Sequence, residues 1–219
     1  PSFVQSFPRF IRKRHKLLLP LLPTAVETFD LRAYDLVISS SGAFAKGVIT
    51  KPEAVHVSYC HSPMRFAWDW YHNYLQEQRL GFFRRSIAVT ARNIVRMWDR
   101  QAAERVDYFI ANSQTTAKRI KAYYLRDSSV IYPPVDVTRF PFPNKSSGYF
   151  LLVSRLVPYK RIDIVIKAFN KLKFPLLVIG EGSEFGHLQS IANPNVKLLG
   201  FQSDEKVKTY LANCEAFIF

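Results

Sequence analysis

Short apolar runs, separated by longer segments of helical period, occupy most of the chain. Runs of this kind predict buried strands when they are bounded by Gly, Pro or polar residues. They fall at 34–40, 54–59, 107–111, 148–153, 174–179 and 196–199. A further run at 216–219 has the pattern of the middle of a buried strand.

Apolar residues recur with helical spacing between these runs and predict helices at 84–105, 113–124, 163–173 and 183–192. Five residues of the first helix share one face, which we expect to be packed: Ile87, Ala91, Ile94, Trp98 and Ala102. Strands that alternate with helices predict an α/β protein with parallel sheets.

The stretch 130–147 is rich in proline and has no period, which is typical of a linker between domains. We therefore predict two Rossmann-like α/β domains, at 1–143 and 144–219. Both ends of the chain have the pattern of cut ends, so we expect a fragment of a longer protein in which both domains are incomplete.

The net charge of the chain indicates which class of partner it binds. The 219 residues carry 31 Lys and Arg against 17 Asp and Glu, a formal charge of +14. Such a balance favours an anionic partner, which could be a nucleotide, a nucleic acid or an acidic membrane surface. No nucleic-acid-binding motif is present and the cations form no recognisable stripe, so we expect no nucleic-acid partner.

Cys60 and Cys214 lie far apart without metal-ligand spacing, which makes a disulfide framework or a zinc site unexpected. The apolar stretch 17–26 is broken by prolines and is too short to cross a bilayer. There is no signal-peptide pattern. These features favour a cytoplasmic protein.

The first residues mix aromatic and basic side chains. Phe3, Phe7 and Phe10 are interleaved with several Arg and Lys residues up to position 16. The mixture suits a peripheral position on anionic lipid at the inner face of a membrane. It also suits a helix that packs its Phe stripe into the core, and the pattern alone leaves both readings open.

Candidate chemistry begins at 154–161, between a predicted strand and a predicted helix. Arg155 and Lys160 lie five positions apart there, at the carboxyl end of the strand 148–153. Ligands of open α/β sheets bind at this end, and a following helix N-terminus favours an anion. An Arg fork and a Lys point charge predict a diphosphate site, although a solvated turn has the same composition.

The next two strands also end in loops suited to binding. Gly180, Glu181 and Gly182 follow the strand 174–179, and Gly200-Phe201 ends the strand 196–199. Glycine lets the backbone approach a ligand closely. Earlier in the chain His61 follows the strand 54–59, where its imidazole could hydrogen-bond a sugar hydroxyl or a phosphate oxygen.

The order and spacing of the loops at 154–161, 180–182 and 200–201 resemble the donor-binding half of family-4 retaining glycosyltransferases, which have the GT-B fold. The string 59–69 resembles the histidine-containing loop of bacterial family-4 enzymes that build surface polysaccharides, especially O-antigen mannosyltransferases. The resemblance covers essentially the whole chain. One departure is Gly42, where these relatives are expected to carry a histidine.

The resemblance implies transfer of a hexose, with mannose from GDP-mannose favoured, to a saccharide or polyprenyl-linked acceptor in polysaccharide synthesis. It implies that Arg155 and Lys160 stabilise the leaving nucleoside diphosphate and that His61 lines the site near the transferred sugar. Donor contacts would come from Ser154, Gly180, Glu181, Gly182, Phe201 and Gln202, the last two holding the base. No metal or other cofactor is expected, and the family's donor-contacting carboxylates would lie beyond residue 219.

Two alternatives remain at this point. One is another GT-B enzyme that uses a UDP-sugar, such as a sugar-phosphate synthase. The other is a non-enzymatic binder of anionic polymers, for which the charge of +14 is the argument.

Overall fold

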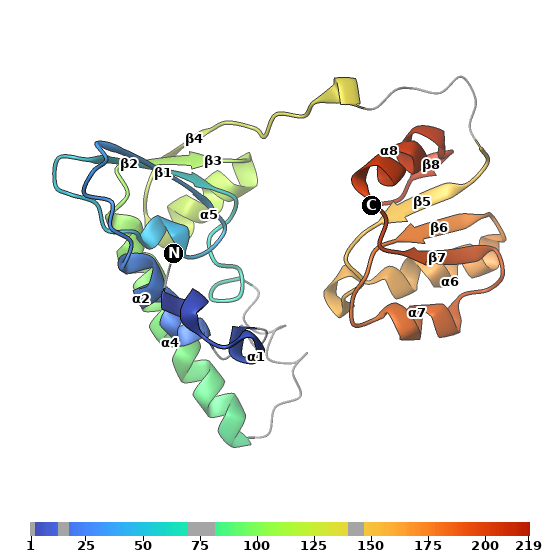
Figure 1. Ribbon diagram of the computed structural model, residues 1–219, viewed down its shortest axis with the longest axis horizontal. Helices are drawn as coiled ribbons and strands as arrows, with labels where there is room; N and C mark the ends of the chain where they lie inside the picture. The colour runs from blue at the N-terminus through green and yellow to red at the C-terminus, as the bar shows by residue number, and fades with distance from the viewer. Residues whose placement is uncertain (1–2, 13–17, 70–81, 140–146) are drawn as a thin grey trace. The chain divides into compact units, whose positions relative to one another are not determined.

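The computed structural model describes residues 3–12, 18–69, 82–139 and 147–219. The chain divides into two compact units, Pro1–Pro134 and Val135–Phe219, here called unit 1 and unit 2 (Figure 1). Each unit contains one four-stranded parallel sheet flanked by helices. The α/β class with parallel sheets predicted from the sequence is confirmed.

The sheet of unit 1 has the order β1-β2-β3-β4, so each strand lies beside the next one along the chain. Its strands are β1 Leu36–Ser41, β2 Val55–Cys60, β3 Tyr108–Ala111 and β4 Ser128–Val130. The register places Ser40 opposite Tyr59 and Cys60 opposite Ala111. All three pairings are parallel, so the carboxyl ends of the strands meet at one edge.

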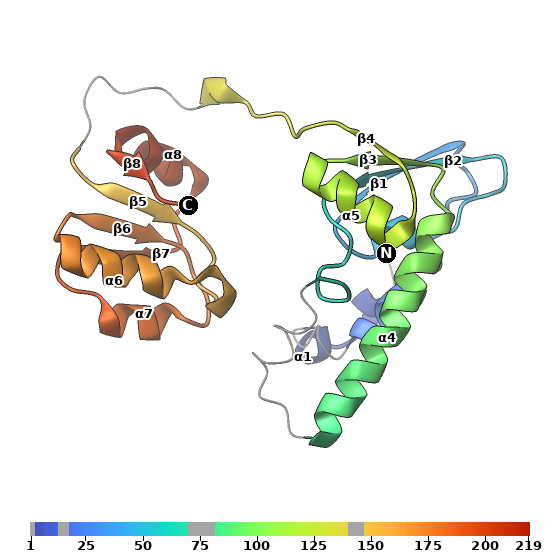
Figure 2. The ribbon, with the colours of Figure 1, turned by 180° about the vertical axis from the view of Figure 1, so that it is seen from behind.

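Helices cover one side of this sheet. The longest described are α4 Phe82–Glu104 and α5 Gln114–Tyr124, which Figure 2 shows on the same side. Shorter elements are α1 Arg9–Arg12, α2 Leu22–Glu27 and 3₁₀ turns at Phe3–Ser6, Leu19–Leu21 and Ala45–Gly47. The side chain of Ser113 caps α5 by accepting a hydrogen bond from the N–H of Thr116, as the sequence predicts.

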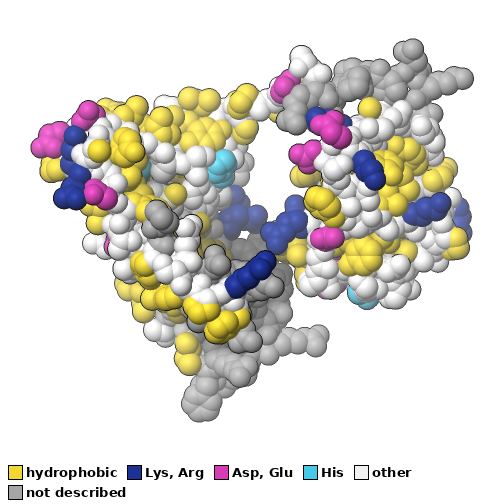
Figure 3. All heavy atoms as spheres, viewed as in Figure 1, with side chains coloured by type: hydrophobic (Ala, Val, Ile, Leu, Met, Phe, Trp, Pro, Cys, Tyr) yellow, Lys and Arg dark blue, Asp and Glu magenta, His cyan; other side chains and the backbone are white. Residues whose placement is uncertain are grey.

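Burial alternates along the strands because successive side chains point to opposite faces. Ser39, His56 and Phe109 are buried on the face toward the helices. On the other face Ile38 is 67 % exposed and Tyr108 is 65 % exposed. Hydrophobic side chains consequently reach the surface, as the yellow atoms in Figure 3 show.

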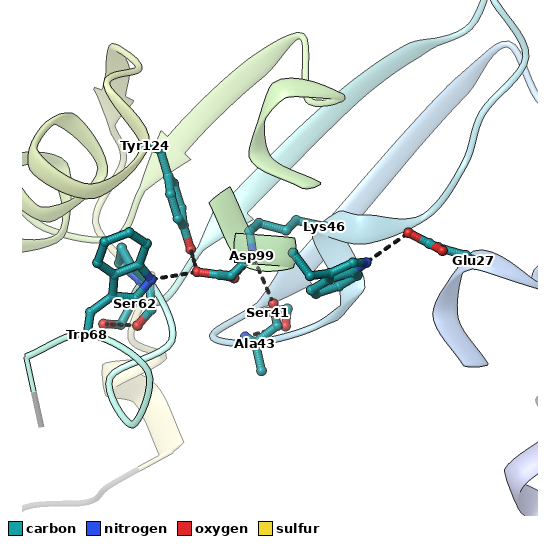
Figure 4. Close-up of polar contacts among 10 residues, drawn as sticks. Glu27, Ser41, Ala43, Lys46, Ser62, Trp68, Asp99 and Tyr124 are labelled. Atoms are coloured by element: carbon teal, nitrogen blue, oxygen red, sulfur yellow. Dashed lines mark hydrogen bonds and ion pairs between the residues drawn. The ribbon is translucent and has the colours of Figure 1, made fainter. Parts of the chain in front are cut away.

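A buried carboxylate lies where α4 meets the rest of unit 1 (Figure 4). Asp99 is fully buried and forms an ion pair with Lys46, whose side chain is 4 % exposed. Its Oδ2 atom accepts hydrogen bonds from Trp68 Nε1 and from the Tyr124 hydroxyl, both at 2.8 Å. Burial beside this carboxylate raises the pKa of Tyr124, which keeps its hydroxyl a donor.

The predicted packed face of α4 is wrong in part. Ile87 is 70 % exposed and Ile94 is 56 % exposed, whereas Val95, Asp99 and Ala102 are buried. Hydrophobic period does not identify a buried Asp as an inward position, so the predicted face is rotated from the observed one.

Unit 2 has the strand order β7-β6-β5-β8. Its strands are β5 Phe150–Val153, β6 Leu176–Ile179, β7 Val196–Gly200 and β8 Ala216–Phe217, and its helices are α6 Ile162–Leu172, α7 Phe185–Ile191 and α8 Asp204–Asn213. Leu152, Ile166 and Leu176 belong to its buried core. The chain runs from β5 through β6 to β7 in one direction and then returns to pair β8 with the other edge of β5.

The structure corrects one expectation about a strand and adds a strand that the sequence pattern does not predict. The run 216–219 does form a strand, because Ala216 and Phe217 pair with β5, but this strand is exposed and not buried, and Phe217 is 42 % exposed. The fourth strand of unit 1, β4, was not predicted, because Ser128 and Ser129 give it no apolar run. Part of the predicted linker, 140–146, lies outside the described residues.

Replacing Asp99 by Asn should destabilise unit 1 strongly. The change removes the charge that neutralises buried Lys46 while it keeps the size of the side chain. Breaking a buried pair in this way costs about 3–5 kcal/mol. The matched control is Asp127→Asn, because Asp127 pairs with Lys121 at the surface and should contribute at most about 1 kcal/mol. Urea unfolding of both variants measures the difference, and equal losses would contradict the assignment.

The stability of unit 1 should also fall in mild acid because of His56. Burial disfavours the charged imidazole and lowers the pKa of His56 below 6.5, and its Nδ1 atom has no hydrogen-bond partner among the described residues. Below about pH 6.5 the unfolded chain takes up a proton that the folded chain refuses, so stability declines from there down to the folded pKa. His56→Asn should flatten this decline in urea midpoints measured at successive pH values. An unchanged slope would show that other groups cause it.

Candidate functional site

The strand order of unit 2 creates a switch point between β5 and β8. The chain leaves β5 toward β6 on one side, and β8 occupies the other side. Loops that leave adjacent strands in opposite directions open a crevice at their carboxyl ends, which is where ligands bind in open α/β sheets. The candidate diphosphate loop leaves β5 at this position.

A pocket of about 450 Å³ lies at the switch point. Its polar lining comes from Ser154, Arg155, Tyr159 and Lys160. The start of α6 contributes Ile162 and Val165, and residues after β8 contribute Ile218 and Phe219. The structure thus brings together three of the predicted site residues, Ser154, Arg155 and Lys160.

The cations of this loop differ in their pairing. Arg161 forms an ion pair with Asp163, with 3.1 Å between Nε and Oδ1. Within the part of the chain that the structure describes, neither Arg155 nor Lys160 has an acidic partner within ion-pair distance. Lys160 Nζ lies 5.9 Å from the ring centroids of both Tyr159 and Phe219. The two cations that line the pocket are therefore available to an anionic ligand.

The backbone supports this arrangement. The chain turns through a 3₁₀ turn, Pro158–Lys160, and a left-handed Arg161 with a φ of 51° before α6 begins. Arg161 makes no side-chain capping hydrogen bond at the N-terminus of α6. Free N–H groups and the positive end of the helix dipole favour an anion there.

The glycines after β6 allow the loops that follow β5 and β6 to lie in close contact. A Cβ atom on Gly180 would lie 1.9 Å from the Ser154 carbonyl oxygen, and one on Gly182 would lie 2.1 Å from that of Leu156. The N–H of Leu156 donates to the Glu181 carbonyl oxygen at 2.9 Å, and the N–H of Ser154 donates to that of Ile179 at 3.0 Å. The sequence suggested close approach of these glycines to a ligand, and the structure shows their close approach to the 154–156 loop.

The remaining predicted donor residues stand at neighbouring strand ends and do not line the pocket at the switch point. The N–H of Gly180 donates to the Gly200 carbonyl oxygen at 2.9 Å, which joins the loops after β6 and β7. Phe201 follows β7 and is 73 % exposed. Gln202 Nε2 donates to the Leu199 carbonyl oxygen at 2.9 Å, so this side chain folds back on its own strand.

His61 belongs to unit 1, where it follows β2 at the carboxyl edge of the sheet. The side chain is exposed, and its Nε2 atom lies 3.0 Å from the hydroxyl of Ser40. The Tyr59 ring lies 5.4 Å away at an interplanar angle of 81°. The backbone N–H of His61 donates to the Ser41 carbonyl oxygen at 3.1 Å.

Sequence reasoning missed Ser40 and Tyr59. Both lie on the exposed face of the sheet, as does His61, because residues two apart in a strand share a face. The signal was present in the alternation of β2, but the β1–β2 register that places Ser40 opposite Tyr59 is not visible in the sequence.

Other reactive groups give no competing site among the described residues. Burial raises the pKa of Cys60 to about 12, so this thiol is a poor nucleophile. The described parts of the chain contain no cluster of three His, Cys, Asp or Glu side chains that could hold a metal ion. The helices described there include none long and apolar enough to cross a membrane.

Two family models match the chain. Residues 2–139 match Glycosyltransferase Family 4, and residues 137–219 match Glycosyl transferases group 1. A comparison with curated proteins finds no match.

Solved structures are similar to this chain at low sequence identity. A sucrose-phosphate synthase from Thermosynechococcus elongatus is 15 % identical with a TM-score of 0.64, covering 96 % of this chain and 56 % of its own. A mutant of S. aureus TarM in complex with fondaparinux, α-GlcNAc-glycerol and UDP is 15 % identical with a TM-score of 0.52, covering 76 % and 32 %. AviGT4, a glycosyltransferase of avilamycin A biosynthesis, is 16 % identical with a TM-score of 0.49, covering 90 % and 48 %.

The chain therefore spans about half or less of the length of these solved proteins. The GT-B type of α/β fold expected from the sequence is confirmed by the two family models and by the sucrose-phosphate synthase structure. Because the first model alone matches more than half of the residues, the chain belongs to Glycosyltransferase Family 4.

Proposed function

We propose that the protein transfers a hexose from a nucleoside diphosphate sugar to a saccharide or polyprenyl-linked acceptor, with retention at the anomeric carbon. The observation that carries this proposal is the pocket at the β5–β8 switch point, where Arg155 and Lys160 stand without acidic partners among the described residues. An anion with two phosphates suits a pocket with two separate cations.

The cations act on the leaving group. During transfer the bond between the anomeric carbon and the diphosphate oxygen breaks, and the acceptor oxygen forms the new bond. The acceptor's proton leaves with the nucleoside diphosphate. Arg155 presents a planar fork of donors and Lys160 a mobile point charge, so together they stabilise the negative charge that develops on the diphosphate. The two cationic side chains would neutralise this negative charge themselves, so the proposal includes no metal ion.

The other predicted residues receive roles by their positions. Ser154, Gly180, Glu181 and Gly182 form the joined loops beside the diphosphate, and backbone around Phe201 and Gln202 holds the base. His61 at the carboxyl edge of unit 1 contacts the transferred sugar. Unit 1 supplies the acceptor side, within a domain boundary that we propose at 143–144.

The donor is proposed to be GDP-mannose and the pathway surface-polysaccharide synthesis. A UDP-sugar is the alternative donor, which would make the enzyme a sugar-phosphate synthase or a related transferase. UDP is the nucleotide in the TarM complex, and the sucrose-phosphate synthase covers nearly the whole chain, although both matches show only the fold. Membership of a glycosyltransferase family sets aside the non-enzymatic anionic-polymer binder.

A membrane surface is proposed as a further partner. None of residues 3–10 is buried, and Phe10 is 68 % exposed, so this stretch does not pack a Phe stripe into the core. Residues 11–12 have no described side-chain placement and 13–17 lie outside the described residues. Unit 1 has 20 Lys and Arg against 10 Asp and Glu. Exposed aromatic side chains on a cationic unit suit anionic lipid.

Arg155→Ala and Lys160→Ala should each lower turnover by about two orders of magnitude, the value of one lost donor to a developing charge. The donor is first chosen by thermal-shift screening of GDP-, UDP- and ADP-hexoses on the full-length enzyme. Initial rates at saturating donor then measure the effect. Lys171→Ala, an exposed lysine at the other end of α6, is the matched control and should leave turnover unchanged. Wild-type turnover in both site variants would refute the diphosphate role.

Liposome flotation tests the membrane partner. Vesicles that contain phosphatidylglycerol should recover the protein, vesicles of phosphatidylcholine alone should not, and replacing Phe3 and Phe10 by Ala should lower recovery. Phe174→Ala removes an exposed phenylalanine of unit 2 and serves as the control. Equal recovery on both kinds of vesicle would exclude an anionic-lipid surface.

A further inference from the structure

The imidazole of His61 is contacted by Ser40 and Tyr59 at the exposed face of the unit 1 sheet. Ser40 and Tyr59 are partners in the β1–β2 register, and His61 follows Tyr59 by two residues on the same face. The Tyr59 ring contacts the imidazole edge to face, and its hydroxyl donates to the Ile131 carbonyl oxygen at 3.0 Å. Tyr59 is therefore fixed across the sheet and braces the imidazole.

The backbone of His61 is fixed as well. Its N–H donates to the Ser41 carbonyl oxygen at 3.1 Å, and its own carbonyl oxygen accepts from the Thr116 hydroxyl at 3.1 Å. Thr116 lies in the first turn of α5, which is capped by Ser113. The backbone and one side of the ring are thus fixed. The hydroxyl of Ser40, 3.0 Å from Nε2, then restricts the rotation of the ring that remains.

The Ser40 contact leaves Nδ1 as the nitrogen that a ligand can reach. Nδ1 lies on the Cβ side of the ring. Gly42 lies beside this residue, since a Cβ atom placed on Gly42 would lie 3.7 Å from the Cβ atom of His61, at an ordinary contact distance. Sugar and phosphate oxygens accept hydrogen bonds, and a neutral imidazole donates from one nitrogen only.

We propose that Ser40 is a positioning residue for His61. Its hydroxyl donates to Nε2 and holds the imidazole as the Nδ1–H tautomer, so that Nδ1–H is offered to an oxygen of the bound donor. This inference rests on the proposed contact of His61 with the donor. It adds that the orientation and tautomer of His61 are set from β1, by a residue outside the histidine loop.

Long-range ¹H–¹⁵N correlation spectra of the histidines test the tautomer directly, without any activity. They are recorded about two pH units above the ordinary imidazole pKa of ~6.5, where histidine side chains are neutral. We expect His61 to be the Nδ1–H tautomer in the wild type and a mixture in Ser40→Ala. Ser40→Thr keeps the hydroxyl and should restore the wild-type spectrum. Ser129→Ala, at an exposed position of β4, is the matched control and should change nothing.

Activity supplies the second readout. Ser40→Ala should lower turnover about tenfold, the weight of one hydrogen bond near the top of its usual range, with little change in the KM for the donor. Ser40→Thr should remain within about twofold of the wild type. Ser129→Ala should match the wild type.

The outcomes separate the two proposals. If His61→Ala lowers turnover but Ser40→Ala leaves the His61 tautomer unchanged, the Ser40 proposal is wrong and the donor contact of His61 stands. If the tautomer shifts in Ser40→Ala but His61→Ala transfers at the wild-type rate, the donor contact is wrong, and Ser40 orients a ring that takes no part in transfer. An Nε2–H tautomer in the wild type also overturns the positioning role.

Discussion

The carboxylate of Asp99 joins four separate parts of unit 1, and the candidate loop at His61 depends on it. Lys46 comes from the β1–β2 connection, Trp68 from the loop after β2, Tyr124 from the end of α5, and Asp99 itself from α4. Trp68 also stacks on Tyr123, with 4.7 Å between ring centroids. His61 lies between buried Cys60 and this anchored tryptophan, so both ends of its loop are fixed. Burying two charges costs several kcal/mol per ion unless their hydrogen bonds are satisfied, and here three side chains surround one carboxylate.

Unit 2 fixes its candidate site in a different way, by close contact of backbones. Gly180 and Gly182 have no Cβ atom, and this lets the loop after β6 press against the carbonyl groups of Ser154 and Leu156. The hydrogen bonds between these loops then set the path of the chain that carries Arg155. A side chain at either glycine would separate the loops and move the pocket lining, so the glycines act on the site through its shape.

The sequence predicted those parts of the fold that depend on local pattern. Apolar runs located six strands, Ser113 located the start of α5, and the charges at 155 and 160 were found at the end of β5. Features set by distant partners were not predictable in this way. The polar strand β4 is defined by its pairing with β3, and the inward face of α4 is defined by a buried Asp whose partners lie elsewhere in the chain. Ser40 was missed for the same reason, since its contact with His61 depends on strand register.

The pairing of charges separates residues that stabilise the fold from those available for chemistry. Lys46 is neutralised by Asp99 inside unit 1. Arg161, which follows Lys160 in the sequence, forms an ion pair with Asp163. Arg155 and Lys160 are exposed and line a pocket instead. A cation at the surface costs little, because water solvates it, and two cations that line one pocket beside a helix N-terminus favour an anionic ligand. In the proposed function a diphosphate would occupy this pocket, and the same two charges would then add binding free energy and stabilise the leaving group.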